Sequence, residues 1–216
     1  FGYFLFFGEN QGHKNEVIKN IFQNKYKEST YSYEENEIII NRESFFNTIL
    51  SKSFFENEKL ILINRATDKI LNIIEELMEK KIEDLIIILN ANALEKKSKI
   101  RSLFEKSKET VCVAFYEDNF QTLSGITNNF FRTCKVPISQ ETINLIVQRA
   151  RGDRLNLNNE LVKIKNYLGD KKKIDIKDIL KLTNLAENYN VSELVDSCLS
   201  KNIKKTINIL NENNYT

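Results

Sequence analysis

Short apolar runs alternate with stretches of helical periodicity through the first half of the chain. The runs are Tyr3–Phe7, Leu60–Ile63, Leu85–Leu89 and Thr110–Tyr116, with a weaker candidate at Thr30–Tyr33. Apolar residues at helical spacing lie between them, at about 14–25, 44–50, 69–80 and 98–107. Strands that are apolar at consecutive positions and separated by helices are typical of a parallel sheet covered on both faces. The pattern therefore predicts an α/β domain.

Strand signals stop after Tyr116, and the rest of the chain is predicted to be helical. Pro137, the only proline, marks a boundary because proline does not continue a helix. We therefore predict an α/β core at residues 1–136, a small helical domain at 137–186 and the start of another helical unit at 187–216. The predicted helices are 120–134, 139–150, 155–168, 175–182 and 192–210.

Composition and charge narrow the classes of function. Hydrophobic residues make up 41% and charged residues 29% of the 216 residues, which is the balance of a folded protein. The net charge of +2 does not by itself indicate a nucleic-acid-binding protein. No apolar run reaches the roughly 18 residues of a membrane span. We therefore expect a cytoplasmic protein with no membrane partner.

Cysteine and histidine usage argues against metal and redox chemistry. Cys112, Cys134 and Cys198 are widely spaced, odd in number and unaccompanied by a histidine cluster, which fits neither a zinc site nor a disulfide framework. His13 is the single histidine, so a catalytic triad or a histidine-rich metal site is not available. We expect no catalytic residue, no metal and no cofactor.

The turn after the first predicted strand has the position of a phosphate-binding loop. Such a loop follows G-x-x-x-x-G-K-[ST]: its backbone N–H groups surround phosphates, its lysine pairs with them and its hydroxyl binds magnesium. Gly8 and Lys14 stand in register with this pattern. His13 occupies the second glycine position, where its side chain would crowd the backbone, and Asn15 replaces the hydroxyl residue. Alone, one glycine and one lysine also fit any α/β domain with a turn there.

The acidic pair that completes such a site is also missing. In nucleotide-hydrolysing proteins of this kind Asp-Glu follows the apolar third strand, whereas here Asn64 and Arg65 follow Leu60–Ile63. An arginine repels magnesium, and an asparagine cannot act as a general base. The sequence therefore predicts a degenerate nucleotide site that does not hydrolyse ATP, made of Gly8, His13, Lys14, Asn15, Asn64 and Arg65.

Four segments are similar, and in the same order, to segments of the delta subunits of the bacterial DNA polymerase III clamp loader. They are residues 3–10, 50–63, 85–94 and 152–161. Order and spacing carry this resemblance, which extends over nearly the whole chain. It implies an AAA+-type fold derived from P-loop proteins, with an α/β core and an all-α helical lid. It also implies that residues 187–216 begin a helical collar domain that is truncated in this sequence.

The resemblance further implies function and partners. A delta subunit would bind the sliding clamp (the beta subunit) and help open it during DNA replication, without hydrolysing ATP itself. Its other partners would be the gamma/tau and delta prime subunits and primer-template DNA within the complex. The chain would then belong to the DNA-directed DNA polymerase III holoenzyme, a nucleotidyltransferase, while lacking catalysis of its own. Arg154 resembles the lid arginine of the fold and would form an ion pair in the lid or at a subunit interface.

Phe54 and Phe55 lie at a polar junction between a predicted helix and a predicted strand. Two adjacent rings cannot easily both point into a core from such a junction, and an exposed pair suits a partner's pocket. The resemblance implies that this pair is the clamp-binding wedge, with Leu50 as a further apolar contact. Other Phe pairs occur at 6–7, 45–46 and 130–131, so a position in the core is the alternative.

Two other functions stay open at this point. The chain could be an active AAA+ ATPase, or a DNA-binding regulatory module on a vestigial nucleotide-binding fold. The basic residues at 96–101 and the lysines at 171–173 could approach DNA phosphates, although most such runs are solvated faces. Nucleotide binding would indicate the ATPase, and salt-sensitive binding of DNA by the chain alone would indicate the regulatory module.

Overall fold

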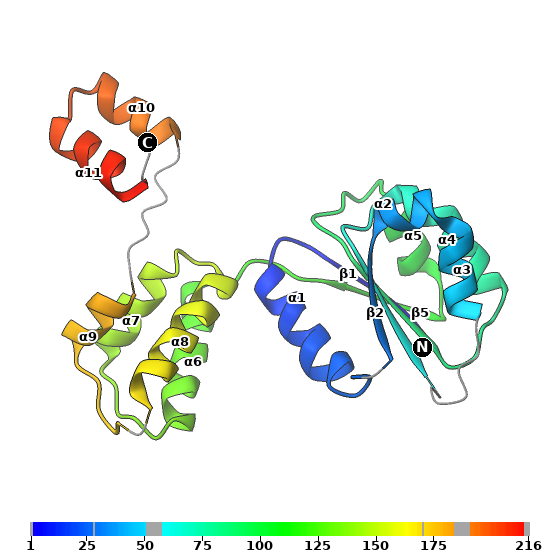
Figure 1. The fold of residues 1–216 in the computed structure, drawn as a ribbon, viewed down its shortest axis with the longest axis horizontal. Coiled ribbons are helices and arrows are strands. Elements are labelled where there is room, and N and C mark those ends of the chain that lie inside the picture. Colours follow the sequence, from blue (N-terminus) through cyan, green and yellow to red (C-terminus); the bar gives the residue numbers. More distant parts are fainter. Residues whose placement is uncertain (1, 28, 51–57, 170, 184–190, 214–216) are drawn as a thin grey trace.

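The computed structural model describes residues 2–27, 29–50, 58–169, 171–183 and 191–213. Within these ranges a five-stranded parallel sheet flanked by helices is followed by a group of helices (Figure 1). The strands are β1 (Tyr3–Phe7), β2 (Thr30–Glu34), β3 (Lys59–Asn64), β4 (Leu85–Asn90) and β5 (Thr110–Ala114). The predicted α/β class with a parallel sheet is confirmed.

The strand order brings the ends of three strands together. The order is β2-β3-β4-β1-β5, and each neighbouring pair is parallel. In the register of the sheet, Asn90 of β4 lies opposite Phe6 of β1 and Asn64 of β3. The carboxyl ends of parallel strands are where open α/β sheets bind ligands. Gly8 and the residues after it therefore leave the sheet at the edge where a ligand site is expected.

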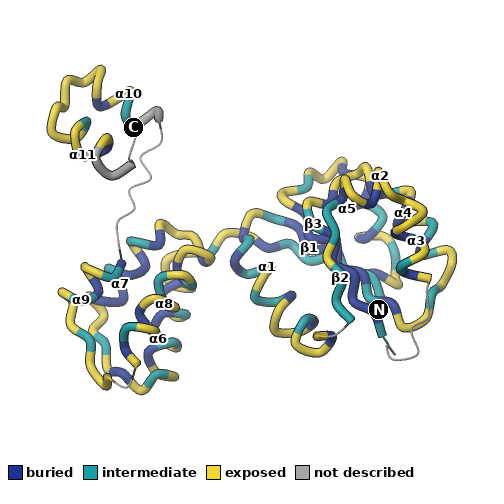
Figure 2. Tube along the Cα trace, in the orientation of Figure 1, coloured by how far each residue is buried: buried dark blue, intermediate teal, exposed yellow. Residues whose placement is uncertain are grey.

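Helices cover both faces of the sheet, because side chains alternate between the faces along each strand. On one face, Leu5, Ile61 and Ile87 pack against α2 (Glu35–Ile40), α3 (Arg42–Leu50), α4 (Leu71–Glu79) and α5 (Lys99–Lys106). On the other face, Phe6 and Ile88 pack against α1 (Gln11–Val17) and η1 (Ile18–Gln23), a turn of π-helix. Buried positions run along the strands between these two helical layers (Figure 2).

The helices after β5 have a core of their own. They are α6 (Phe120–Thr133), α7 (Gln140–Arg149), α8 (Arg154–Leu168) and α9 (Ile176–Leu182). Leu123 and Phe131 of α6 are buried in one cluster with Ile146 of α7 and Leu161 of α8. α6 therefore groups with the helices that follow it, and the predicted division at residue 136 separates it from its packing partners.

The last described segment forms two helices where the sequence predicted one. α10 (Val191–Leu199) ends, and α11 (Ile203–Asn213) begins, around a left-handed residue, Lys201, with a φ of 55°. The side chain of Asn202 then accepts a hydrogen bond from the Lys205 amide, as a helix N-cap does. The apolar periodicity of 192–210 conceals this break. Among the described residues, no helix combines the length and the apolar character needed to cross a bilayer.

Two further differences lie near the predicted ligand site. The helix predicted from residue 14 begins earlier, at Gln11, because Asn10 caps it. The helix α2 was not predicted from the sequence; it starts with a capping box in which Glu34 and Glu37 each accept a backbone N–H of the other. The strand β2 runs directly into α2 without a turn, so no turn signal in the sequence marks where the helix begins.

Candidate functional site

The loop after β1 is in backbone contact with the segment after β5. Gly8 has a φ of 120°, and a Cβ added there would lie 2.2 Å from the carbonyl oxygen of Phe115. Its amide donates a hydrogen bond to the carbonyl of Asn92 at 3.1 Å. The amide of Asn10 donates to the carbonyl of Phe115 at 3.3 Å. Glycine is required at position 8 for steric reasons that involve no phosphate.

Helix α1 begins inside the stretch that would form a phosphate loop. Asn10 is its N-cap, and the Asn10 side-chain oxygen accepts from the His13 amide at 3.0 Å. The amide of Lys14 donates to the Asn10 carbonyl at 3.1 Å. Amides that would surround phosphates in a functional loop are thus bonded within the protein. The crowding expected at His13 is avoided because that residue is helical.

His13 packs against the protein instead of bordering an open loop. Its ring meets Phe115 edge-to-face, with 5.1 Å between the ring centroids. Burial lowers the pKa of His13, and the positive charge of Arg154 lowers it further. The imidazole is therefore held in its neutral form as part of the contact with Phe115.

Lys14 is fully buried. Its Nζ donates to the carbonyl of Ala91, just after β4, at 2.6 Å. Burial lowers the pKa of Lys14 from 10.5 to about 8, because the charged amine has left water. Asn15, the next residue, is exposed and accepts a hydrogen bond from Gln11 at 3.0 Å. The lysine is thus directed to the strand end, and its neighbour offers no hydroxyl for a metal.

Asn64 and Arg65 occupy the strand end where the acidic pair is missing. The Asn64 amide donates to the hydroxyl of Ser32 at 3.1 Å, and its oxygen accepts from Asn90 at 3.2 Å. Arg65 is exposed and pairs with Glu34 at 2.6 Å. Asn64 therefore ties β2, β3 and β4 together, while Arg65 turns outward. The described part of the chain has no group of three or more His, Cys, Asp or Glu residues that could hold a metal.

Arg154, the first residue of α8, is the centre of a buried ion-pair cluster. Its Nε and Nη2 donate to the two carboxylate oxygens of Asp118, at 2.7 and 2.6 Å. Its Nη1 donates to Glu16 of α1 at 3.0 Å. Burial alone raises the pKa of Asp118, but the hydrogen bonds from Arg154 and Asn10 outweigh it and hold that pKa below its ordinary value. Asp118 and Arg154 are both charged in this cluster.

Sequence reasoning named Arg154 but not its partners. Asp118 and Glu16 lie 36 and 138 positions away along the chain, so no local spacing connects them. Asn10, which donates to Asp118 at 2.8 Å, was recognised in the sequence only as part of the loop. Asp153 was recognisable as a helix cap, since it precedes an apolar helical pattern and accepts from the Asn156 amide at 2.7 Å.

Of the residues proposed for clamp binding, Leu50 is described. It is the last residue of α3 and is 49% exposed, whereas Phe45 and Ile49 of the same helix are buried in the core. Phe54 and Phe55 lie outside the described residues. The described end of α3 therefore presents an apolar side chain to solvent directly before the predicted wedge.

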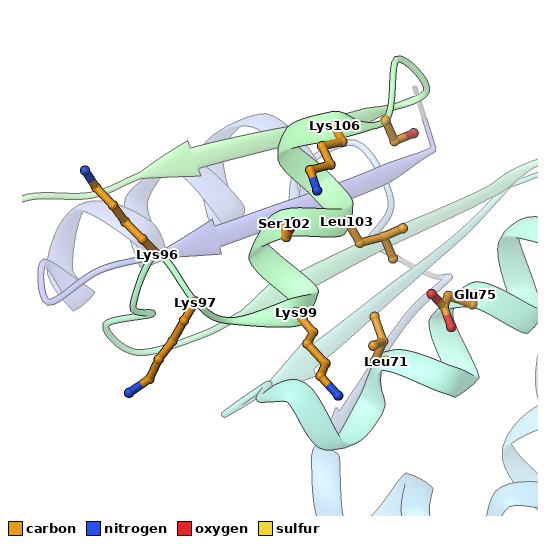
Figure 3. A pocket seen from close by; sticks show the side chains of 9 residues that line it. Leu71, Glu75, Lys96, Lys97, Lys99, Ser102, Leu103 and Lys106 are labelled. Carbon is orange, nitrogen blue, oxygen red and sulfur yellow. The ribbon is translucent and has the colours of Figure 1, made fainter.

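A lysine-lined groove lies between α4 and α5. Its cavity of about 660 Å³ is bordered by Lys96, Lys97, Lys99 and Lys106, with Leu71 and Glu75 of α4 on the opposite side (Figure 3). The lysine side chains point in different directions and do not converge on one point (Figure 3). This spread fits an extended anion better than a single small one. Arg101 faces elsewhere and bonds Glu105 and the Leu94 carbonyl.

The start of α5 beside this groove is already capped. Asp68 accepts hydrogen bonds from the Ser98 hydroxyl at 2.7 Å and from the Ile100 amide at 3.0 Å. The bond from the Ile100 amide is the main reason that the pKa of Asp68 is lowered. A carboxylate therefore compensates the helix dipole, and any attraction of this groove for anions comes from its lysines.

Comparison with known proteins assigns the family. The model of the DNA polymerase III delta subunit family matches residues 4–117, more than half of the 216 residues. The chain belongs to this family. The resemblance to the delta-subunit family found in the sequence is thereby confirmed. No curated protein sequence matches the chain.

Solved structures share the fold of this delta-family chain. The Bacillus subtilis DNA clamp loader delta protein matches with a TM-score of 0.59 and 15% identity, over 100% of this chain and 69% of that one. The Thermotoga maritima RuvB Holliday junction branch migration motor matches with a TM-score of 0.54 and 11% identity, over 83% of this chain and 60% of that one. The chain thus spans less than two thirds of RuvB. These matches confirm the predicted AAA+-type fold, an α/β core followed by helices.

Proposed function

We propose that this delta-family chain binds the sliding clamp and helps open it during DNA replication, without binding or hydrolysing ATP. Family membership supports the clamp-loader role. The proposal that the chain neither binds nor hydrolyses ATP rests on the hydrogen bonds that the degenerate loop makes within the protein. The amides of Gly8, Asn10 and His13 all donate to acceptors within the protein.

Admitting a nucleotide would require several of these bonds to break together. Each hydrogen bond exchanged in this way contributes about 0.5–1.5 kcal/mol to stability, so a phosphate would have to compensate for several at once. Lys14 would also have to leave the Ala91 carbonyl. Asn15, Asn64 and Arg65 would then supply neither a magnesium ligand nor a base. The geometry therefore favours a subunit that acts through binding energy over an active ATPase.

Clamp binding would be centred on the end of α3 and the residues after it. Leu50 supplies an exposed apolar side chain there, and Phe54 and Phe55 follow in the sequence. Burying each ring in a pocket of the clamp would contribute about 1.5–3 kcal/mol from apolar area. Aromatic side chains buried at the centre of an interface commonly supply most of its affinity.

The remaining partners follow from the same role. The chain would assemble in the cytoplasm with the gamma/tau and delta prime subunits and would lie near primer-template DNA. The groove lined by Lys96, Lys97, Lys99 and Lys106 supports a contact with the DNA backbone, since its charges are spread along an extended surface.

A clamp titration tests the proposal. The purified chain is titrated with its cognate sliding clamp, and the same is done with a Phe54→Ala/Phe55→Ala variant. The wild type should bind, and the variant should lose binding with little change in melting temperature. Tyr116→Ala/Phe120→Ala is the matched control, because these aromatic side chains are 78% and 52% exposed and lie outside the predicted wedge. Equal loss in both variants, or a large fall in melting temperature for Phe54→Ala/Phe55→Ala, would contradict the assignment.

A further inference from the structure

The contact between the sheet domain and the helical group α6–α9 contains a closed network of charged and amide side chains. α1 lies on the side of the sheet domain that faces these helices (Figure 1). Arg154 of α8 binds Asp118 through two bonds and Glu16 of α1 through a third. Asn158, one turn further along α8, donates to the other oxygen of Glu16 at 2.6 Å. Both carboxylate oxygens of Asp118 and both of Glu16 therefore accept hydrogen bonds from side chains of α8.

The backbone is equally close at this point. A Cβ added to Gly12 of α1 would lie 2.6 Å from the amide nitrogen of Leu155 and 2.9 Å from the carbonyl carbon of Arg154. α1 and the first turn of α8 thus touch without a side chain between them. Asn10 extends the network into the degenerate loop, since its amide donates to Asp118 while its oxygen caps α1.

Burial makes the ion pair at the centre of this network sensitive to loss of either partner. The side chains of Arg154 and Asp118 are 8% and 7% exposed. Removing one partner of a buried pair leaves an uncompensated charge, which is more destabilising than the loss of an exposed pair. The Lys163–Glu160 pair on the surface of α8 offers a comparison, since the Lys163 side chain is 50% exposed.

We propose that Arg154, Asp118 and Glu16 form a latch that holds α6–α9 in one orientation against the sheet domain, so that no ligand is needed to set this orientation. The elements that would frame a nucleotide, the loop, the segment after β5 and the start of α8, are bonded to one another. The latch is a property of the contact between the two parts of the chain, and it stands whether or not the chain binds a clamp.

Hydrogen exchange of the full chain tests the latch. Arg154→Met should speed amide exchange in α1 and the first turns of α8 by about tenfold or more, with β3 and β4 as the unchanged internal reference. Asp118→Asn should do the same, and the combined variant should add little, because both changes break one pair. Glu16→Gln, a milder variant whose site is more exposed, should have a smaller effect in the same peptides. Lys163→Met is the matched control and should leave α1 and α8 unchanged.

Small-angle scattering supplies the second readout. The wild-type profile should be the same with and without Mg-ATP, whereas Arg154→Met and Asp118→Asn should broaden the distribution of distances between the two parts. Three results would overturn the proposal: unchanged exchange and scattering in folded Arg154→Met and Asp118→Asn, equal acceleration of exchange in β3 and β4, or a wild-type profile that changes with Mg-ATP.

Discussion

Replacing Lys14 with Met should abolish the rise in stability that we expect of the wild type at alkaline pH. Lys14 is fully buried, and its Nζ binds the carbonyl of Ala91. Methionine has an unbranched apolar side chain of similar length, so it can fill the same space without a charge. The perturbation therefore removes the amine from the degenerate loop while leaving its packing largely intact.

The magnitude follows from the pKa of Lys14. A pKa of about 8 in the folded protein, against 10.5 in the unfolded chain, corresponds to about 3 kcal/mol. Below pH 8 both states hold the proton, and the folded state carries the full cost of the buried charge. Between pH 8 and 10.5 only the unfolded chain holds the proton, so stability rises with pH across this window. Lys14→Met lacks this titration and lacks the rise.

The assay compares urea unfolding of the wild type and Lys14→Met at pH 7 and at about pH 10.5. Other titrating groups affect the wild type and the variant alike, and the loss of the donor to the Ala91 carbonyl affects both pH values alike, so both effects cancel in the difference. The free energy of unfolding of the wild type, minus that of the variant, should increase by about 3 kcal/mol between the two pH values. Adding Mg-ATP should not alter it. Parallel stability curves would show that the amine is solvated or paired with an anion, and would refute the reasoning.

Three further outcomes are expected. Gly12→Ala should destabilise the chain although alanine favours helices by about 1 kcal/mol, because the new Cβ meets the backbone of Leu155 and overpacking costs about 1–3 kcal/mol; thermal unfolding measures the net sign. Asp68→Ala should cost about 1–2 kcal/mol in chemical unfolding, because it removes the carboxylate that accepts from the Ile100 amide and from the hydroxyl of Ser98, the N-cap of α5; an unchanged midpoint would count against that role. Lys97→Glu/Lys106→Glu should reduce the salt dependence of DNA binding by the assembled clamp loader, and an unchanged slope would exclude the groove as a DNA contact.

The sheet and most helices could be predicted because their signals are local. Ile61 and Ile87 belong to short apolar runs that are typical of buried parallel strands, and Pro137 and Ser139 mark the start of a helix. The predicted boundaries of helices were wrong where the sequence signals of two neighbouring elements overlapped. α2 was missed because β2 leads into it through Glu34 without a turn, and the break at Lys201 interrupts a continuous apolar pattern.

The candidate site was only partly accessible from the sequence. The replacements at His13, Asn15, Asn64 and Arg65 were readable because a spaced motif defines what each position should hold. That the amides of Gly8, Asn10 and His13 bond within the protein could not be predicted, since it depends on where each amide finds an acceptor in the fold. The partners of Arg154 come from distant segments, and only the folded chain brings Glu16 and Asp118 to it.

The most direct test of the central claim is the affinity of the purified chain for its sliding clamp, measured by calorimetry with and without Mg-ATP. A subunit that grips the clamp through apolar side chains and has no nucleotide site should bind with the same dissociation constant in both conditions. Absence of binding, or an affinity that changes with Mg-ATP, would contradict the account.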